Sequence, residues 1–371
     1  MKRFLLLFFA VLIFTSCNSA SEMEKHSETI VPYVSKSKVY YSEYGQKRIV
    51  NSYGFCDLNG DVVIDPSDDI STLICYETDD GFSFYVVGLG QSEQSTYADG
   101  FDPTKTLIIP SSGEWCVELD EIGWWTVSAG DGGIFASLDY TTDYNGHINY
   151  IIEAKTLLYD YSGNLVKEFG KSTYISNYSK QYKNCVSIDL IEEENERRIY
   201  VNSKGELVEN PEYIPYEYTP VKQDFENLPY AQDGYSFVDL SNDGNFLVYT
   251  VGEVDYLVSP MEYTIENDKR KAYILDLNTN EILHTLHGNC SARFVGNEDR
   301  FIFLYNSDNI EGGSAYNYCL YDTQKRSLVV NGAEMIEDFR ADGNDYFAVS
   351  FKNSSILYDS EMNQIIKTYF E

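Results

Sequence analysis

One short pattern recurs along the chain: an apolar strand that ends in Asp or Asn, a short polar turn, and a second apolar strand. The segment ILYDSEMNQIIKTYF at residues 356–370 is one example. This pattern predicts a β-hairpin, because β-branched and aromatic residues favour strands whereas Asn, Asp and Gly favour turns. The same pattern occurs at residues 54–65, 157–169, 199–210, 273–286 and 319–330, and in a weaker form at 100–110.

The residue that ends the first strand of each hairpin recurs about every 50 positions. These residues are Asp57, Asp102, Asp160, Asn202, Asp276, Asp322 and Asp359. A second hairpin type, with an acidic turn that contains Asn or Gly, precedes several of them, at 237–250, 292–306 and 339–351. Two hairpins per period make four strands, the content of one propeller blade. We therefore predict an all-β fold, a β-propeller of about seven four-stranded blades, with six or eight as alternatives.

Three segments resemble repeats of known propeller families. Residues 273–306 resemble a degenerate WD40 repeat, in which Leu275-Asp276 stands where Trp-Asp would be and residues 286–289 stand near the expected Gly-His. The segment DLSNDGNFLVYT (239–250) is similar to the Asp-Gly turn of TolB-type repeats, and YGFCDLNGDVVIDP (53–66) is similar to a WG-type repeat. These resemblances imply a propeller, but none of the motifs is specific for a ligand.

The first 17 residues predict export and lipid anchoring. Lys2 and Arg3 precede eleven apolar residues, Phe4 to Phe14, which is too short a run to span a bilayer and is typical of a signal peptide. Residues 14–17 resemble the lipobox of bacterial lipoproteins, which implies that Cys17 carries a lipid anchor to the membrane. Secretory cleavage near Cys17 without a lipid is the alternative. In either case we expect the mature chain to work outside the cytoplasm, and with the lipid anchor it is a membrane-anchored protein of the bacterial cell envelope.

The predicted organisation has three parts. Residues 1–16 are the signal peptide, residues 17–36 are the lipidated Cys17 and a flexible tether, and residues 37–371 are a single propeller domain. The segment KVYYSEY (38–44) is expected to complete the last blade, the one that contains Asp359, and so to close the ring without an unpaired edge.

Charge excludes some partners. The formal net charge is −32, and removing residues 1–16 with Lys2 and Arg3 makes it −34. Nucleic acids and anionic lipid surfaces would repel such a chain, whereas weak cation binding or a basic partner stays open. With 43% hydrophobic residues the chain can bury a core. The six cysteines after Cys17 lie far apart in strand-like runs, so we expect mainly buried thiols, with one or two disulfides possible.

The segment DLNGDVVIDPSDD (57–69) has the oxygen spacing of a calcium loop. However, Val62 stands where such a loop needs Gly for its sharp bend, and the bidentate Glu is missing. Asn59-Gly60 between two apolar runs is a strong hairpin signal, so we favour a hairpin, with calcium binding as a secondary use.

Other candidate chemistry is sparse. His284, His287 and Cys290 have zinc-like spacing, but on a strand the two histidines point to opposite faces, and we expect no metal there. No catalytic set, cofactor motif or metal site is predicted. Trp124 and Trp125 are adjacent, so one should face inward and the other outward, where it could stack on a sugar or on an aromatic residue of a partner.

The sequence therefore favours an envelope lipoprotein whose propeller is a non-enzymatic binding or scaffold module for a protein or glycan. The alternative is a glycan-processing enzyme or accessory protein that uses paired carboxylates on the propeller face as acid and base.

Overall fold

The computed structural model describes most of the chain as strands joined by turns. The described residues are 21–22, 29–41, 47–67, 70–90, 103–119, 125–138, 155–171, 173–175, 182–192, 195–213, 235–251, 254–258, 263–268, 271–296, 299–310 and 313–370. They contain no helix, and hence none that is long and apolar enough to cross a membrane. Strands are favoured because runs of Val, Ile, Tyr and Phe alternate with Gly, Asn and Asp.

The chain divides into two compact units. Unit 1 contains Met1–Val31, Ser52–Tyr218 and Arg340–Gly343, and unit 2 contains Pro32–Asn51, Thr219–Phe339 and Asn344–Glu371. The prediction of a single domain over residues 37–371 stays a prediction. A three-stranded sheet consists of β2 (Ile30–Tyr41), β3 (Lys47–Asp57) and β4 (Val62–Ser67).

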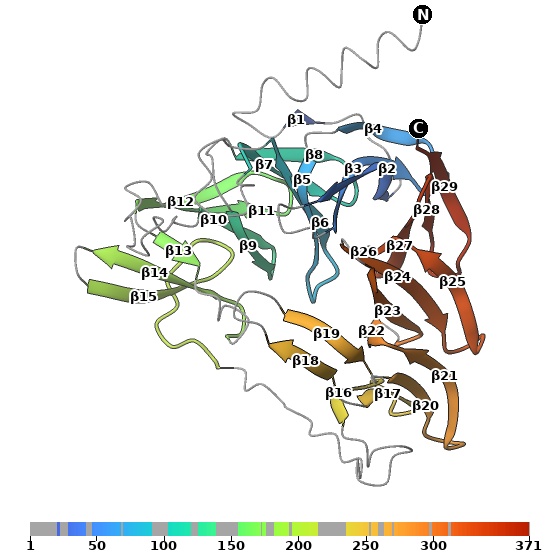
Figure 1. The fold of residues 1–371 in the computed structure, drawn as a ribbon. Coiled ribbons are helices and arrows are strands. Elements are labelled where there is room, and N and C mark those ends of the chain that lie inside the picture. Colours follow the sequence, from blue (N-terminus) through green and yellow to red (C-terminus); the bar gives the residue numbers. More distant parts are fainter. Residues whose placement is uncertain are drawn as a thin grey trace, which may run out of the picture. The chain divides into compact units, whose positions relative to one another are not determined.

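Unit 1 holds three further sheets, whose strands are labelled in Figure 1. The first has the order β1-β8-β7-β6-β5, with β1 (Ser21–Glu22), β5 (Ile70–Glu77), β6 (Ser83–Leu89), β7 (Lys105–Pro110) and β8 (Trp115–Leu119). The second contains β9 (Trp125–Gly130), β10 (Gly133–Leu138), β11 (Lys155–Asp160) and β12 (Leu165–Lys171). The third contains β13 (Thr173–Ile175), β14 (Val186–Glu192) and β15 (Asn195–Val201).

Unit 2 holds three four-stranded sheets and one hairpin. The first sheet contains β16 (Tyr235–Leu240), β17 (Phe246–Val251), β20 (Lys271–Asp276) and β21 (Glu281–His287), and the hairpin contains β18 (Val254–Val258) and β19 (Tyr263–Asp268). The second sheet contains β22 (Asn289–Val295), β23 (Phe301–Ile310), β24 (Gly313–Asp322) and β25 (Ser327–Ala333). The third contains β26 (Met335–Ala341), β27 (Asn344–Phe351), β28 (Ser354–Tyr358) and β29 (Gln364–Tyr369).

These sheets confirm the all-β prediction and its number of blades. In the described part of the chain, seven sheets of three to five strands follow one another, and the β18–β19 hairpin is an insertion within one of them. Such a succession of small antiparallel sheets is the strand architecture of a β-propeller.

The cores lie between successive sheets of a unit. In unit 1, Ile108 and Trp115 pack with Trp125 and Ile134 of the next sheet. In unit 2, Leu320 and Val330 pack with Phe347 and Val349. The second strands β6 and β10 of two sheets in unit 1 are buried throughout, because each has a strand on either side and a sheet against its faces.

The prediction for residues 38–44 is wrong. The described part of this segment belongs to β2, which lies beside β3, and residues 42–46 lie outside the described part of the chain. The last sheet already receives four consecutive strands from residues 335–369 through short turns, so it takes no strand from the N-terminus. The contact between β2 and β29 is made by a side chain, since the Thr368 hydroxyl donates to the Val34 carbonyl over 2.6 Å.

Two predicted boundaries also change. The expected tether ends earlier, because β2 starts at Ile30 and its residues Val31 and Val34 are buried. In the weakest predicted hairpin, residues 100–110, the described residues Lys105–Pro110 form a single strand, β7, and the turn that follows it is at residues 111–114. Asp102 lies outside the described residues.

One predicted hairpin is only half formed. After β15, the chain makes a single bridge from Val201 to Leu207 and then departs, with Tyr213 bridging to Tyr182. Pro211 lies on this departing segment and has no N–H to extend a ladder. The sheet of β13, β14 and β15 therefore has three strands.

Candidate binding surface

Each four-stranded sheet has two different ends. Consecutive strands are antiparallel, so the first-to-second and third-to-fourth connections lie at one end, which we call the turn end. The second-to-third connection lies at the opposite end, which we call the hairpin end. We describe the turn end first because six of the seven recurrent Asp and Asn residues lie there, the seventh, Asp102, being outside the described residues.

Four of these residues organise the same local structure. The side-chain Oδ1 atoms of Asp57, Asp160, Asn202 and Asp359 each accept hydrogen bonds from the backbone N–H groups two and four residues later, over 2.7–3.0 Å. The residue at the third position has a positive φ, as in Gly60, Gly163, Gly205 and Met362. These are tight turns between two strands with a left-handed residue, in which the Asp or Asn side chain accepts hydrogen bonds from backbone N–H groups of the turn.

Asp276 and Asp322 form a close variant of this turn. Each accepts from the N–H groups two and three residues later, and the positive φ moves to Asn280 and Arg326 at the fourth position. The Arg326 guanidinium also contacts the Asp276 carboxylate, which joins the turns of two successive sheets. The recurring residue of the sequence is therefore a structural anchor.

These bonds confirm the hairpin predicted at Asn59-Gly60, whereas residues 68–69 of the same segment lie outside the described residues. Asp57 is used within its own turn, and its backbone N–H donates to the Asp61 carbonyl over 2.9 Å, as in a hairpin. Among the described residues, no group of three or more His, Cys, Asp or Glu is placed to hold a metal ion.

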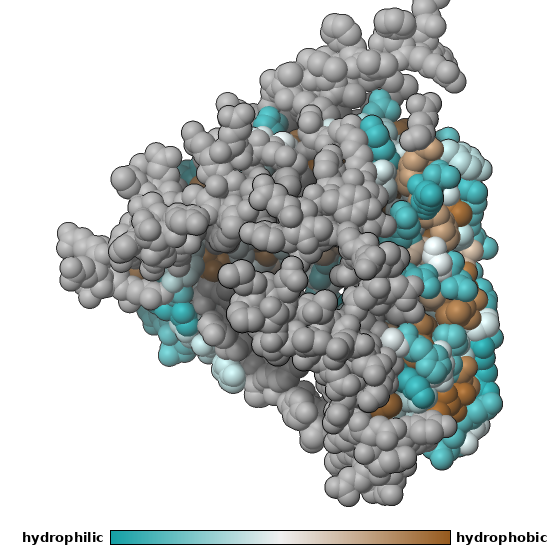
Figure 2. All heavy atoms as spheres, viewed as in Figure 1, coloured by the Kyte–Doolittle hydropathy of each residue, from teal (hydrophilic) through white to brown (hydrophobic). Residues whose placement is uncertain are grey.

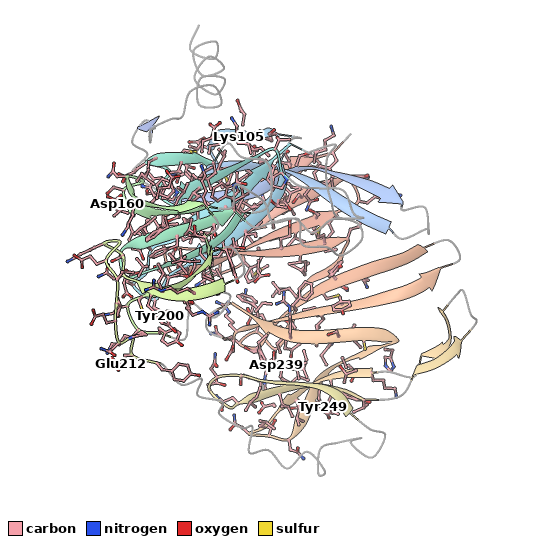
Figure 3. All side chains as sticks on the ribbon, turned by 90° about the vertical axis from the view of Figure 1, so that its left-hand side faces the viewer. Lys105, Asp160, Tyr200, Glu212, Asp239 and Tyr249 are labelled. Atoms are coloured by element: carbon pink, nitrogen blue, oxygen red, sulfur yellow. The ribbon has the colours of Figure 1, made fainter. Side chains whose placement is uncertain are left out.

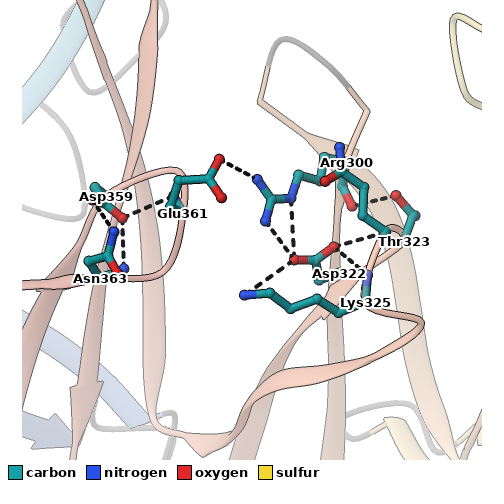
Figure 4. Close-up of polar contacts among 8 residues, drawn as sticks. Arg300, Asp322, Thr323, Lys325, Asp359, Glu361 and Asn363 are labelled. Carbon is teal, nitrogen blue, oxygen red and sulfur yellow. Dashed lines mark hydrogen bonds and ion pairs between the residues drawn. The ribbon is translucent and has the colours of Figure 1, made fainter.

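A buried ion pair lies at the turn end of β23 and β24 (Figure 4). Asp322 is fully buried, and its Oδ2 atom accepts from Arg300 Nε over 3.2 Å and from Arg300 Nη2 over 3.0 Å. The third nitrogen of Arg300, Nη1, donates to Glu361 in the turn between β28 and β29 over 2.8 Å. Arg300 thus connects two successive sheets of unit 2.

The two partners of this pair have shifted pKa values of opposite sign. Burial acts to raise the pKa of Asp322, but the hydrogen bonds from Arg300 and from the backbone outweigh it and hold that pKa below its usual value. Burial acts to lower the pKa of Arg300, but the hydrogen bonds to Asp322 and Glu361 outweigh it and raise that pKa above its usual value. Both groups are therefore charged at neutral pH, which suits a structural contact rather than a proton-transfer role.

In unit 1 the turn end is joined by aromatic rings. Phe82, in the turn between β5 and β6, stacks on Tyr161 of the next sheet with ring centroids 4.0 Å apart. The Tyr161 hydroxyl donates to Asp80 over 3.0 Å, and Trp115 Nε1 donates to the Tyr161 carbonyl over 3.0 Å. The polar atoms of this row are engaged, so it connects two sheets.

The structure gives little support for metal binding or nucleophilic catalysis by His284, His287 and the cysteines. Burial lowers the pKa of His284, which therefore stays neutral, while His287 is exposed and Cys290 is buried. All six cysteines of the described residues are free thiols, and all but the half-buried Cys75 are buried. Burial, followed by the charge of Asp57, raises the pKa of Cys56 to about 12, so this thiol is a poor nucleophile.

The two tryptophans proposed as a binding surface differ. Trp125 is 6% exposed and packs in the core of unit 1, so it is the inward-facing member of the pair and no binding residue. Trp124 lies outside the described residues, and its outward position stays a prediction.

At the hairpin end of unit 2, two connections between the second and third strands of a sheet are longer than the sheet requires. The connection between β27 and β28 takes only residues 352–353. By contrast, β23 and β24 pair along ten residues each, from Phe301↔Asp322 to Ile310↔Gly313, and the connection between β17 and β20 contains the β18–β19 hairpin. Figure 3 shows long strands of unit 2 extending to one side of their sheets.

Aromatic side chains lie at the base of the β23–β24 extension. Phe303, Tyr305 and Tyr318 are half-buried, with ring centroids 5.4–6.2 Å apart. The Arg293 guanidinium lies 5.4 Å from the Phe303 ring centroid and 3.7 Å from Asp338. Elsewhere on the described face, hydrophobic residues are scattered among hydrophilic ones (Figure 2).

Sequence reasoning missed two of these features. The hairpin of β5 and β6 turns on Asp80-Gly81, a dipeptide that is itself a turn signal. The β18–β19 insertion was also missed, although VDYLV and YTIEND have the composition of short strands.

The sheets and their turns define a β-propeller protein. Similar solved structures include TolB from Acinetobacter baumannii (11% identity, 83% of this chain and 64% of that chain, TM-score 0.26) and the β-propeller domain of the Trilobed protease from Pyrococcus furiosus (10%, 80% and 83%, 0.27). Another is an oligogalacturonate lyase in complex with manganese (13%, 91% and 95%, 0.28). No protein family matches the sequence, and no curated protein is significantly similar to it.

Proposed function

We propose that this chain is a bacterial cell-envelope lipoprotein whose propeller is a non-enzymatic binding or scaffold module. Its partner is a protein or a glycan of the envelope. The anchoring part of the proposal is supported by the charged, apolar and lipobox-like segments that end at Cys17.

The binding part is supported above all by the hairpin end of unit 2. Two residues are enough to join the second and third strands of a sheet, as at 352–353, yet residues 252–270 occupy the same position between β17 and β20. Extra chain that the core does not need is a common place for contacts with partners, because a rigid sheet positions it while its residues are free to vary.

The turn-end carboxylates support a structural rather than a catalytic reading. A glycosidase needs two carboxyl groups about 5–9 Å apart that are available to the substrate. Asp57, Asp160, Asp276, Asp322 and Asp359 instead accept hydrogen bonds from their own turns, and Asp322 is buried beneath Arg300.

The anchor is tested by expressing the full chain and its Cys17→Ala variant in bacteria with labelled palmitate. We expect the wild-type chain to carry the label and to partition into the detergent phase, and Cys17→Ala to do neither. Cys56→Ala is the matched control, because Cys56 is buried in the sheet of β3, and should keep the label. An unlabelled wild-type chain would leave ordinary secretion as the explanation.

The non-enzymatic reading is tested by incubating the purified protein with isolated envelope glycans. Retention of a glycan without new reducing ends, or cross-linking to an envelope protein, is the expected result. Release of reducing ends in proportion to the amount of protein would overturn it in favour of the glycan-processing alternative.

A further inference from the structure

The β5–β8 sheet of unit 1 has a fifth strand, which comes from near the N-terminus of the chain. β1 pairs antiparallel with β8, with Ser21 opposite Cys116 and Glu22 opposite Trp115 (Figure 1). Among the described residues, β8 would otherwise be the edge of that sheet and would present unpaired backbone N–H and C=O groups. The beginning of the described chain is therefore attached to a sheet whose other strands come from residues 70–119.

The chain is attached to the same sheet a second time, just before and at the start of β2. The Ile30 N–H donates to the Ser111 carbonyl, and the Tyr85 hydroxyl donates to the Ile30 carbonyl, both over 2.7 Å. The Ile30 side chain is fully buried. The Thr29 hydroxyl donates to one oxygen of the Asp342 carboxylate, whose other oxygen accepts from the Ser111 hydroxyl over 2.7 Å. The sheet thus holds the N-terminal part of the chain at two points.

The first of these attachments limits the distance from the sheet to Cys17, the residue proposed to carry the lipid. Ser21 is four residues after Cys17. An extended chain spans at most about 3.3–3.6 Å per residue, so Cys17 lies within about 14 Å of β1. A free tether that ended at Thr29 would be twelve residues long and would allow about 40 Å. Pairing of β1 with β8 therefore shortens the reach of the anchor about threefold.

We propose that β1 replaces the free tether and holds the β8 edge of the β5–β8 sheet beside the lipid surface, a step that rests on the lipid anchor proposed above. The acyl chains on Cys17 enter the bilayer, so the backbone of Cys17 lies at the headgroups and β1 lies within about 14 Å of them. The mature chain has a formal charge of −34, so attraction to anionic lipid does not hold the sheet there. The backbone pairing of β1 does.

The pairing is tested by a disulfide in the lipidated full chain. Directly opposed residues share a face and have Cβ atoms about 4.5–5.5 Å apart, close to the spacing of a disulfide. We therefore expect Ser21→Cys to cross-link to the native Cys116 thiol on mild oxidation with diamide. The matched control combines Ser21→Cys with Cys116→Ala and should keep the introduced thiol reduced. Absence of the cross-link, or an undiminished one in the control, would overturn the proposal.

The position of the sheet is tested in phosphatidylcholine vesicles whose headgroups carry a nitroxide quencher. A fluorophore is attached to Glu114→Cys, at the start of β8, or to Lys204→Cys, in the third sheet of unit 1 as the matched control. Both side chains are exposed, and both variants carry Cys75→Ala so that no half-buried thiol takes the label. We expect the fluorophore at position 114 to lose most of its emission and that at position 204 to lose little. Equal losses would overturn the proposal.

A longer tether separates the effect of β1 from any affinity of the sheet for lipid. Twenty Gly and Ser residues inserted after Asn18 span about 25 Å on average and leave every described residue unchanged. We expect the loss of emission at position 114 to fall to the level at position 204. An unchanged loss would show that the surface of the sheet binds lipid by itself and would overturn the role of β1.

Failure of this proposal and failure of the lipid anchor give different results. A wild-type chain that carries no palmitate and does not sediment with the vesicles would overturn both. A chain that carries palmitate and sediments with the vesicles, but whose fluorophore at position 114 keeps its emission, would overturn the position of the sheet and leave the anchor standing.

Discussion

At the scale of residues, the turn end is held by side chains that serve their own backbone. Asp160 accepts two N–H groups of its turn, and Gly163 in the same turn has a φ of 77°. An L-residue in this left-handed region is strained, whereas glycine adopts it freely. Met362 shows that the position can be filled by another residue, at a φ of 65°, where the surrounding turn holds it.

Substituting Gly163 tests this requirement. A Cβ atom at Gly163 would lie 2.8 Å from the ring of Trp115, whereas one at Gly244, which has a similar φ of 72°, would meet nothing within 4 Å. We expect Gly244→Ala to lower the free energy of unfolding by about 1 kcal/mol through backbone strain. Gly163→Ala should cost about 1–3 kcal/mol more because the buried indole must move. Chemical denaturation of both variants measures the difference, and equal losses would contradict the clash.

At the scale of elements, Arg300 connects two successive sheets of unit 2. Its side chain is 9% exposed and lies between the buried Asp322 and the exposed Glu361. Breaking a buried pair by removing one partner is costly because the other charge stays buried without compensation. The turn end of the β22–β25 sheet, which holds Arg300 against Glu361, therefore depends on one carboxylate, that of Asp322.

Asp322→Asn tests this dependence and its pH profile. We expect the variant to be less stable than wild type by about 3 kcal/mol at pH 7. The pKa of Asp322 is lowered in the folded state from 3.8, so its contribution is present above that value and is lost as pH falls through the folded pKa. The stability difference between the two proteins should therefore shrink in acid. Denaturation between pH 7 and pH 2.5 measures it.

The control for this series is Glu361→Gln. The Glu361 side chain is 67% exposed, so its loss should cost less than about 1 kcal/mol. A difference between wild type and Asp322→Asn that does not change with pH would show that the carboxylate charge is not what stabilises the contact.

At the scale of the whole molecule, the net charge of −32 opposes the folded state by repulsion. Salt screens such repulsion over a Debye length of about 10 Å at 0.1 M. The turn carboxylates already accept hydrogen bonds from backbone N–H groups, so a divalent cation is not required to balance them.

We therefore expect the melting temperature to rise with added NaCl, and CaCl₂ to do no more than NaCl at equal ionic strength. A chelator should leave the melting temperature unchanged. Thermal melts in the three solutions measure this, and a calcium-specific rise would restore the loop at residues 57–69 as a metal site.

The parts of the fold that were predictable are local in sequence. Asp-Leu-Asn-Gly at 57–60 turns the chain because its own side chain and glycine satisfy the turn, and the same is true near Asp160 and Asp359. The predicted partner of residues 38–44 was wrong because pairing between distant strands depends on which edges are left open. Only Trp125 of the two candidate tryptophans can be placed, and its burial is decided by the neighbouring sheet.

By itself the sequence determined the strand and turn content, the period of about 50 residues and the acidic charge, since each depends on neighbours within a few positions or on composition alone. Tertiary structure alone decided that Arg300 meets Glu361, 61 residues away, and that β2 pairs with β3. It also decided that β18 and β19 stand apart from a sheet that is complete without them. These outcomes depend on long-range packing, in which many segments of similar local preference compete for the same edge or face.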